Sequence, residues 1–277
     1  MTRLQQQDII ALGENLAVYE RRLRAATGSG LAEIAAHALA MTPMASDCLL
    51  KDTVAAVIPV SYGEGLIPGF SEAVQGILEF LGCTAFVTRQ GNVRGLCEAI
   101  ERGATLLFLS DDDDFVVMNL AAGRTSHNSE ATGRGYGAAL DLMAGGVDER
   151  DVLVIGAGPV GQAAARYLDA RGGRVTVYDR DHGRARSLIE TIPSSRLAPD
   201  LATALQYCSL IVEATPSAGV LTQKDLTSRT MIAAPGVPLG VDSEGQAFLG
   251  CRLIHDALEI GVATMLYTVL APMTVGE

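Results

Sequence analysis

Several features that would define other classes of protein are missing from this sequence of 277 residues. No apolar run reaches the roughly 20 residues that span a bilayer, and the N-terminal segment lacks the apolar core and small-residue cleavage site of a signal peptide. No block of Lys and Arg stands out, and the net charge is −11, which argues against nucleic acid and anionic membranes as partners. We therefore expect a cytoplasmic protein with a cationic or small-molecule ligand.

Disulfide and metal-binding patterns are missing as well. The five cysteines are scattered and include no C-x-x-C pair, so they predict reduced thiols in the core. The four histidines are not spaced as metal ligands, so no metal site is expected. His37 lies in an apolar segment and is interpreted as a packed side chain.

What is present predicts an α/β fold. Short apolar runs rich in β-branched and aromatic residues fit strands that are buried on both faces. The segments between them carry helical periodicity and end in Gly, as helices often do. The alternation of strand and helix predicts a parallel sheet. The expected strands are 54–60, 83–88 and 105–110, and the expected helices between them are 70–82 and 93–103.

Two domains are expected. Residues 1–140 would supply helices and a small parallel α/β substrate domain. Residues 141–277 would form a Rossmann dinucleotide-binding domain whose last helix packs back towards the first domain. The helices expected outside the first sheet are 9–23, 31–41, 134–150 (with a turn) and 260–270.

A dinucleotide-binding pattern opens the second half of the chain. Gly156, Gly158 and Gly161 form G-x-G-x-x-G between an apolar strand and an amphipathic helix. The first glycine permits a tight turn, the second lets the backbone approach a pyrophosphate, and the third lets helix and strand pack closely. The next strand ends at Asp179, whose carboxylate would bind ribose hydroxyls and repel a 2′-phosphate. This favours NAD, although the neighbouring Arg180 could accept that phosphate.

Two later strands, 209–216 and 230–238, are expected to end at the same crevice, because strand carboxyl ends line it in doubly wound sheets. Thr215–Pro216 and Pro235–Gly236 are therefore predicted beside the ribose and nicotinamide, with ordinary turn roles as the alternative. A Rossmann unit that binds FAD, S-adenosylmethionine or nothing is the alternative for the whole motif. The predicted cofactor-binding residues are Gly156, Ala157, Gly158, Pro159, Val160, Gly161, Tyr178, Asp179, Arg180, Ala214, Thr215, Pro216, Pro235 and Gly236.

Four consecutive aspartates, Asp111 to Asp114, follow the third predicted strand. If this strand end faces the nicotinamide across a cleft, a carboxylate there can hold a substrate ammonium. It can also take up a proton while an amine carbon is oxidised. The alternative is a solvated acidic loop that caps the next helix.

Taken together, these segments resemble the pyrrolysine synthase family along nearly the whole chain. The resemblance implies NAD-dependent oxidation of the terminal amine of 3-methyl-D-ornithyl-N6-L-lysine. Capture of the imine or aldehyde by the α-amine, with loss of ammonia or water, would then close the ring of L-pyrrolysine. The matching segments are IPVSYGEGLIPGF (58–70), FVTRQGNVRG (86–95), SDDDDFVVMNL (110–120), VLVIGAGPVG (152–161), EATP (213–216), AAPGVP (233–238) and EIGVATMLYTVL (259–270).

The resemblance also implies site residues. Asp111 matches the catalytic acid that faces the substrate, with Asp112 as a second participant, while Asp113 and Asp114 are expected to be solvated. Core statistics alone would make the apolar members of the site packing residues. The implied substrate-binding residues are Leu4, Ser61, Tyr62, Glu64, Leu66, Ile67, Asp111, Asp112 and Asn128.

The sequence departs from the family pattern at three places. Residues 61–65 read Ser-Tyr-Gly-Glu-Gly where the family has Thr-Ser-Gly-Asn-Gly, Pro68 is unusual, and Glu259 replaces an expected Gly. The altered loop favours another NAD(P)-dependent amine or imine oxidoreductase as one alternative function, and a non-catalytic NAD-sensing protein, in which the acids are only solvated, is the other. A homodimer is compatible with the sequence.

Overall fold

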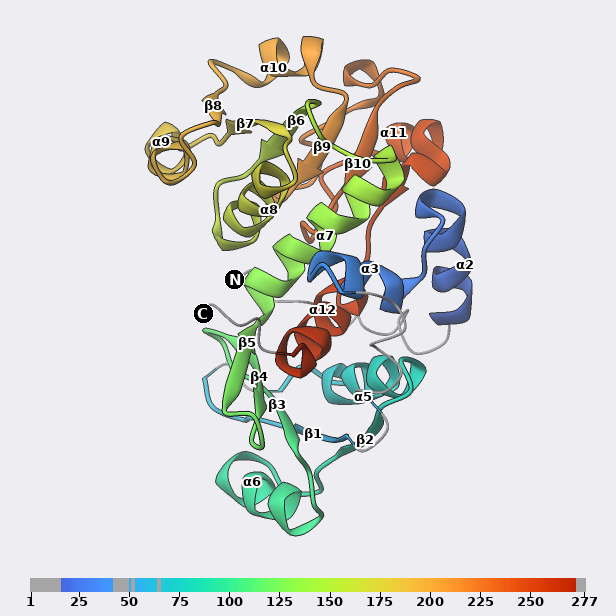
Figure 1. Ribbon diagram of the computed structural model, residues 1–277, viewed down its shortest axis with the longest axis vertical. Coiled ribbons are helices and arrows are strands. Elements are labelled where there is room, and N and C mark those ends of the chain that lie inside the picture. The colour runs from blue at the N-terminus through green and yellow to red at the C-terminus, as the bar shows by residue number, and fades with distance from the viewer. Residues whose placement is uncertain (1–15, 42–49, 51–52, 64–65, 273–277) are drawn as a thin grey trace.

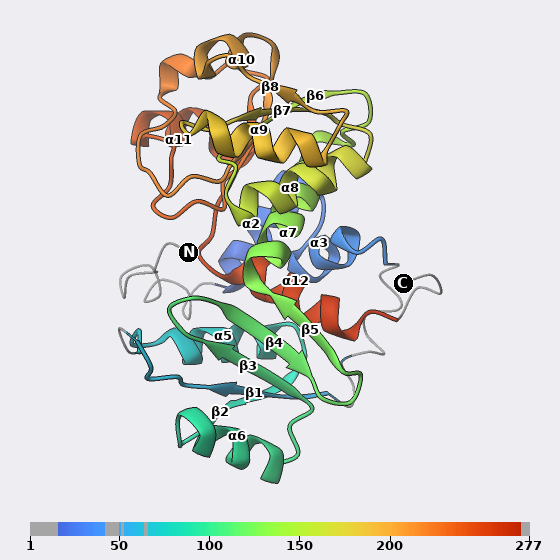
Figure 2. The ribbon, with the colours of Figure 1, turned by 90° about the vertical axis from the view of Figure 1, so that its left-hand side faces the viewer.

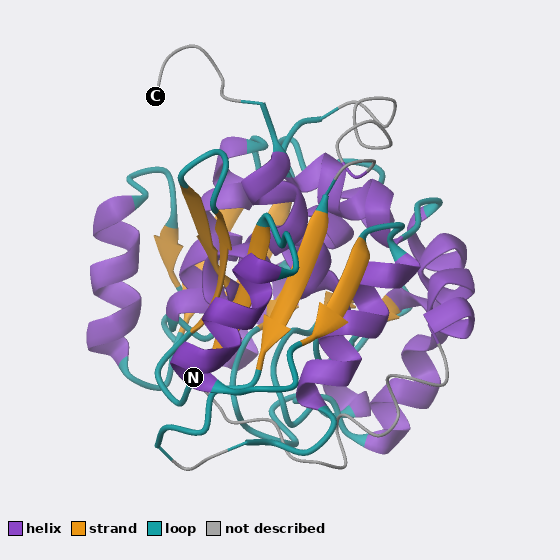
Figure 3. Cartoon of the chain, turned by 90° about the horizontal axis from the view of Figure 1, so that it is seen from below, coloured by secondary structure: helices purple, strands orange, loops and turns teal. Residues whose placement is uncertain are grey.

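The structure is a computed structural model that describes residues 16–41, 50, 53–63 and 66–272. It contains two sheets, one in the upper and one in the lower half of the molecule, with helices between them and on their outer faces (Figure 1). Seen from below, the strands gather in the middle with helices around them (Figure 3). The predicted α/β class is therefore confirmed. Among the described helices, none is long and apolar enough to cross a bilayer.

The first sheet has the strand order β2-β1-β3-β4-β5. The first three strands are parallel, as predicted, and α5 and α6 cover opposite faces of the sheet (Figure 2). The predicted parallel sheet is only part of what the structure shows, because two further strands, β4 and β5, run antiparallel and make the sheet mixed. The elements are β1 (Val54–Ile58), α5 (Phe70–Phe80), β2 (Thr84–Val87), α6 (Asn92–Glu101), β3 (Leu106–Ser110), β4 (Phe115–Asn119) and β5 (Arg124–His127).

The second sheet is wholly parallel, with the order β11-β10-β9-β6-β7-β8. The chain moves outward from β6 to one edge and then returns to build the other, which is the doubly wound Rossmann order. Its strands are β6 (Asp151–Ile155), β7 (Arg174–Tyr178), β8 (Arg196–Leu197), β9 (Leu210–Glu213), β10 (Met231–Ala233) and β11 (Leu253–Ile254). Its helices are α8 (Pro159–Ala170), α9 (His182–Thr191), α10 (Leu201–Tyr207), η1 (Gln223–Asp225), α11 (Ser243–Leu249) and η2 (Gly250–Arg252).

Four helices lie beside or between the two sheets (Figures 1 and 2). The last of them, α12, is buried along nearly its whole length and contacts α3, α5, α7 and both antiparallel strands of the first sheet. The helix α7 follows β5 directly, so it begins at Asn128 and not at the predicted Arg134. These helices are α2 (Leu16–Thr27), α3 (Leu31–Ala38), α7 (Asn128–Ala144) and α12 (Glu259–Leu270).

Glycines in α7 allow it to touch the helices on both sides. A Cβ on Gly133 would lie 2.2 Å from the carbonyl oxygen of Val160 in α8. A Cβ on Gly135 would lie 2.5 Å from the Thr264 hydroxyl of α12. No side chain larger than hydrogen fits these contacts, so α7 joins the Rossmann sheet to the helix that covers the first sheet.

Other core predictions have mixed outcomes. Leu16, Tyr19 and Leu23 of the predicted apolar stripe face the core, while the earlier part of that helix lies outside the described residues. His37 is partly buried and hydrogen-bonded, with Nε2 2.7 Å from an Asp141 carboxylate oxygen. The cysteine prediction is partly wrong. Cys83 and Cys208 are buried, but Cys97 and Cys251 are exposed because they lie on the outer side of α6 and in η2.

A cluster of buried acids and tyrosines joins α2, α7 and the start of α12. Tyr136 donates its hydroxyl to the Asp256 carbonyl (3.0 Å) and accepts from the Asp256 amide (2.9 Å). Tyr19 donates to the Asp256 carboxylate. Glu259 is 5% exposed; burial, reinforced by the charge of Asp256, raises its pKa to about 9. The Glu259 carboxyl therefore holds a proton in the folded protein at neutral pH.

Glu259→Gln should flatten the dependence of stability on pH. The pKa is about 9 in the folded state, above its usual 4.5, so the folded state holds a proton that the unfolded state releases between these values. The proton's contribution to stability is complete below pH 4.5 and is lost as the pH rises to about 9. The loss is at most about 1.4 kcal/mol per pH unit. Urea unfolding at several pH values measures this. Glu101→Gln, exposed on α6, is the control, and parallel curves for parent and Glu259→Gln would contradict the assignment.

Candidate active site

The glycine pattern forms a tight turn between β6 and α8, as predicted. Gly156 has φ +98°, a conformation that favours glycine. A Cβ on Gly161 would lie 1.9 Å from the Gly156 carbonyl oxygen, so the helix can approach the strand only because this residue is glycine. Gly158 caps α8 with no side-chain bond to its amides, Pro159 opens the helix, and a Cβ on Gly158 would meet nothing within 4 Å. The first turn of α8 therefore presents backbone amides to an open space.

Asp179 is half-buried at the end of β7, beside this turn. Its Oδ2 accepts a hydrogen bond from the Ala157 amide (2.7 Å), and its Oδ1 accepts one from the Asp181 amide (2.7 Å). The carboxylate therefore fixes the glycine turn, and its remaining lone pairs can accept further bonds. Arg180 is exposed, and Tyr178 accepts the Gly156 amide at its carbonyl (2.8 Å).

The loops after β9 and β10 meet beside the same turn. Ala214 donates its amide to the Ile155 carbonyl (2.8 Å), and a Cβ on Gly156 would lie 2.8 Å from the Ala214 carbonyl oxygen. A Cβ on Gly236 would lie 2.2 Å from the Thr215 carbonyl oxygen. The predicted segments Thr215–Pro216 and Pro235–Gly236 are therefore brought together at the carboxyl ends of the Rossmann strands.

The four aspartates form the turn of the β3–β4 hairpin, so the alternative that they cap a helix is wrong. Asp111 donates its amide to the Asp114 carbonyl (3.0 Å), and its Oδ1 accepts the amides of Asp113 and Asp114, both at 2.9 Å. The first three aspartates are exposed and Asp114 is half-buried, where it pairs with His127 of β5. We call residues 111–114 the acidic turn. Its own hydrogen bonds hold it in shape.

Residues 61–63, the described part of the glycine-rich segment, lie against the acidic turn. A Cβ on Gly63 would lie 1.8 Å from a carboxylate oxygen of Asp112, so the two loops touch. Ser61 is held by Asn92, which accepts its amide (3.0 Å) and donates to its hydroxyl (2.8 Å). Tyr62 is 81% exposed and does not fill the space between the loops.

The remaining implied substrate residues are less uniformly placed. Leu66 is 54% exposed, whereas Ile67 packs against the core. Leu4 and Glu64 lie outside the described residues. Asn128 opens α7 immediately after the residue that pairs with Asp114, and it accepts the Thr132 hydroxyl (3.0 Å).

The acidic turn and the glycine turn are linked through α7. Asn128 begins this helix beside the acidic turn, and Gly133 touches Val160 in the first turn of α8. A helix rises about 1.5 Å per residue, so these points are separated by roughly 8 Å along α7. Figure 2 shows the β3–β4 turn and the loops after β9 and β10 on the same side of the molecule, at the left.

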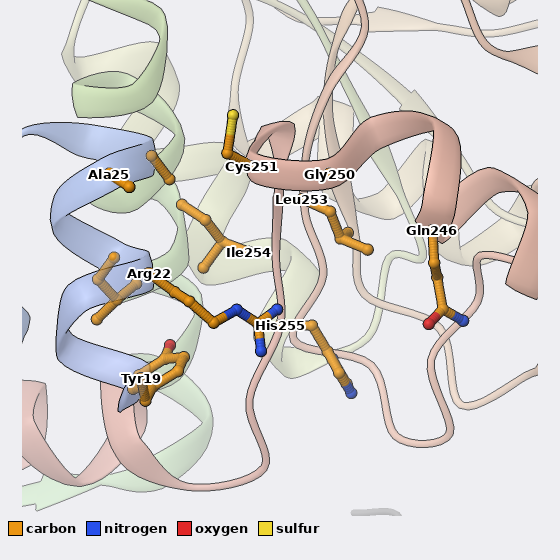
Figure 4. Close-up of a pocket in the computed structure, with 11 residues that line it drawn as sticks. Tyr19, Arg22, Ala25, Gln246, Gly250, Cys251, Leu253, Ile254 and His255 are labelled. Atoms are coloured by element: carbon orange, nitrogen blue, oxygen red, sulfur yellow. The ribbon is translucent and has the colours of Figure 1, made fainter. Parts of the chain in front are cut away.

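A separate pocket of about 340 Å³ lies between α2 and the η2–β11 segment (Figure 4). Tyr19, Arg22 and His255 contribute to its lining. His255 Nδ1 lies 2.8 Å from the Ala234 carbonyl oxygen, so one end of the pocket is beside the loop that follows β10. The pocket is thus close to the Rossmann strand ends but on the side of α2.

Sequence reasoning missed three groups at these sites. His127 and Glu213 were not singled out, although each adjoins a predicted residue. The acidic pair Asp256 and Glu259 was also missed, except that Glu259 was seen as a departure from the family. In the described part of the chain, no three His, Cys, Asp or Glu side chains are placed to hold a metal ion.

Fold comparisons define the class of protein. Shikimate dehydrogenase from Aquifex aeolicus superposes with a TM-score of 0.55 at 16% identity, covering 79% of this chain and 92% of that one. Quinate dehydrogenase from Corynebacterium glutamicum, solved with NAD, gives 0.54 at 17% identity, covering 79% and 93%. Residues 139–242 match the shikimate/quinate 5-dehydrogenase domain. The chain has the fold of a two-domain Rossmann dehydrogenase.

Sequence comparisons identify the family. Residues 8–126 match the N-terminal domain of the pyrrolysine biosynthesis protein PylD. Pyrrolysine synthase from Methanosarcina acetivorans is 32% identical over 271 residues, which cover 98% of this chain and all of that protein. Its counterpart from Methanosarcina barkeri is 35% identical over 219 residues, covering 77% and 80%. The chain belongs to the pyrrolysine synthase family.

Gly158→Val should block dinucleotide binding without unfolding the protein. The backbone at Gly158 is extended (φ −73°, ψ 178°) and a Cβ there meets nothing, so the fold tolerates a side chain that fills the space before α8. We expect the Kd for a dinucleotide to rise by about a hundredfold or more, since several backbone hydrogen bonds are lost. Fluorescence titration measures the Kd and circular dichroism the Tm.

Gly161→Val is the matched comparison for that experiment. Its Cβ would meet the Gly156 carbonyl oxygen at 1.9 Å, so this variant should lose stability, by roughly 1–3 kcal/mol or more. Unchanged dinucleotide affinity in a folded Gly158→Val protein would show that the glycine turn does not bind phosphate.

Proposed function

We propose that this protein oxidises the terminal primary amine of 3-methyl-D-ornithyl-N6-L-lysine with NAD and closes the ring of L-pyrrolysine. The hydride leaves the amine carbon, and the resulting imine, or its aldehyde, is attacked by the α-amine. Ammonia, or water from the aldehyde, is then expelled. Membership in the pyrrolysine synthase family supports this reaction.

One arrangement carries the proposal. The acidic turn, residues 61–63 and Asn128 form one polar edge of the first sheet, and α7 connects that edge to the glycine turn of the Rossmann domain. Oxidation of a primary amine needs a carboxylate beside the nitrogen and a hydride acceptor beside the carbon that bears it. This arrangement offers both on the same side of the molecule.

The residues at the Rossmann strand ends fit a nicotinamide dinucleotide. The open space at Gly158 and the uncapped amides of α8 suit a pyrophosphate. The half-buried Asp179 suits ribose hydroxyls, and the segments Thr215–Pro216 and Pro235–Gly236 suit the nicotinamide end. When bound, the nicotinamide would supply the hydride acceptor. The relatives of this fold were solved with NAD or with NADP, so NAD is part of the proposal.

Asp111 is proposed to bind and orient the reacting amine. Two backbone amides hold its Oδ1, so the side chain is oriented before a substrate arrives, while Oδ2 accepts no hydrogen bond from the described residues. A carboxylate there can bind an ammonium by a charge-assisted hydrogen bond and can take up its proton before the carbon is oxidised. Asp112, which contacts the glycine-rich loop, is the second candidate.

The direct test is incubation of the purified protein with the lysyl-methylornithine precursor and NAD. Mass spectrometry should detect a product that has lost one ammonia and two hydrogens, together with NADH absorbance. A simple primary amine and a lysine-containing dipeptide serve as comparison substrates. Oxidation of these, with none of the precursor, would identify a different amine oxidoreductase.

Asp111→Asn should lower turnover by about tenfold to a few hundredfold. The amide oxygen can still accept the two backbone bonds, so the turn keeps its shape while the negative charge is removed. A hydrogen bond to a charged group contributes about 1.5–3 kcal/mol, and a lost proton acceptor adds to that. Asp113→Asn is the control. That side chain is exposed, so the substitution should leave turnover nearly unchanged. Parent-like turnover in both variants would show that Asp111 does not act on the amine.

The protein should bind NAD more tightly than NADP, and Asp179→Asn should reduce this preference. Asn keeps an oxygen that can accept the Ala157 amide, but it lacks the charge that repels a 2′-phosphate. Asp179→Ala should also weaken the binding of NAD itself, because the Ala157 amide loses its acceptor. Fluorescence titrations with both dinucleotides measure these changes. Tighter binding of NADP by the parent would overturn the ribose assignment.

A further inference from the structure

Glu213 is a buried acid that the proposed reaction does not use. It is the last residue of β9 and is 0% exposed. Its Oε1 accepts the Thr215 amide (3.0 Å) and the Thr215 hydroxyl. Its Oε2 is also buried and has no hydrogen-bond partner in the described part of the chain. A carboxyl group in such surroundings needs an explanation, because burying a polar atom without a partner destabilises the fold.

The carboxyl group is enclosed by two loops. A Cβ on Gly240 would lie 2.4 Å from the carboxyl carbon and from Oε2, and a Cβ on Gly236 would lie 3.1 Å from Oε2. Gly236 also donates its amide to the Glu213 carbonyl (3.3 Å). The side chain therefore fills the space between the loop after β9, which it binds through Thr215, and the loop after β10, which packs around it.

The surroundings favour the neutral form of this side chain. Burial raises the pKa of Glu213, while the hydroxyl and amide of Thr215 and the nearby Gly240 amide oppose the shift. No charged side chain from β6, β10 or the two loops contributes to it. Ionisation would place an uncompensated charge between two closely packed loops, which would push them apart or draw in water.

We propose that Glu213 is a positioning residue that holds the loops after β9 and β10 in the arrangement that receives the nicotinamide end of the cofactor. This rests on the proposed nicotinamide cofactor. Glu213 acts through Thr215 and the segment 234–240 and does not itself touch the ligand. Its neutral form keeps the loops together, so binding of the nicotinamide end weakens as this carboxyl ionises.

Two probes separate the nicotinamide end from the rest of the dinucleotide. NAD should contact both the glycine turn and the loops around Glu213, whereas ADP-ribose lacks the nicotinamide and depends on the glycine turn and Asp179. Titration of parent and variants with each probe between about pH 5 and about pH 9 covers the range in which most proteins stay folded. Circular dichroism at each pH checks that they do.

Three variants give distinct expectations. Glu213→Gln keeps an acceptor for Thr215 and cannot ionise, so NAD affinity should lose the decline with rising pH that the parent shows. Glu213→Ala removes the support and should raise the Kd for NAD by about tenfold, the equivalent of one lost hydrogen bond or a little more, with ADP-ribose affinity unchanged. Glu244→Gln, exposed on α11, is the matched control and should behave like the parent.

The outcomes distinguish the two proposals. If the parent binds neither probe, the proposed cofactor is wrong and the inference falls with it. In a second outcome, the parent binds both probes while the Glu213 variants leave the two Kd values unchanged or change them by the same factor. The proposed cofactor then stands and the positioning role is overturned. If Glu213→Ala does not fold, the pH profile of Glu213→Gln decides: a profile parallel to the parent's overturns the role.

Discussion

The close packing of α7 against α8 and α12 is the constraint on which the rest of the molecule depends. Each glycine inside a helix costs about 0.5–1 kcal/mol relative to alanine, so Gly133 and Gly135 weaken the isolated helix. The contacts with Val160 and Thr264 offset that cost, and they leave no room for a sideways shift. Because α7 starts at the acidic turn and crosses the first turn of α8, its position sets the distance between the proposed amine site and the proposed dinucleotide site.

Close packing also buries acidic side chains in two places. The junction of α2, α7 and α12 closes around Tyr136, Asp256 and Glu259, and the crowded end of β9 closes around Glu213. In both places desolvation by burial raises the pKa of the acid, and at Glu259 the charge of Asp256 adds to the shift. The protein thus keeps two carboxyl groups as hydrogen-bonding structural elements, and it keeps its acidic turn exposed and available for charge.

Much of the fold could be predicted because local sequence patterns determine many of its strands, helices and turns. Continuous apolar runs identified β1, β3 and β6, and the glycine spacing identified the β6–α8 turn. The β3–β4 hairpin could not be predicted in this way, because the acidic turn gives no alternation of apolar and polar residues. The role of Glu213 was hidden for another reason: its enclosure depends on Gly236 and Gly240, which approach it only after β10 is in place. Side chains that acquire their role from distant partners leave no periodic signal.

The bond between Asp179 and the Ala157 amide has a consequence for how this lineage could change its cofactor. The acid that would select against a phosphorylated ribose also supports the turn on which any dinucleotide would rest. A substitution that removes the selection therefore weakens the support in the same step, unless the new residue supplies an oxygen at the same place. Under the proposed preference for NAD, only a few side chains at position 179 would allow a change towards NADP, and a single random replacement is more prone to lose binding than to redirect it.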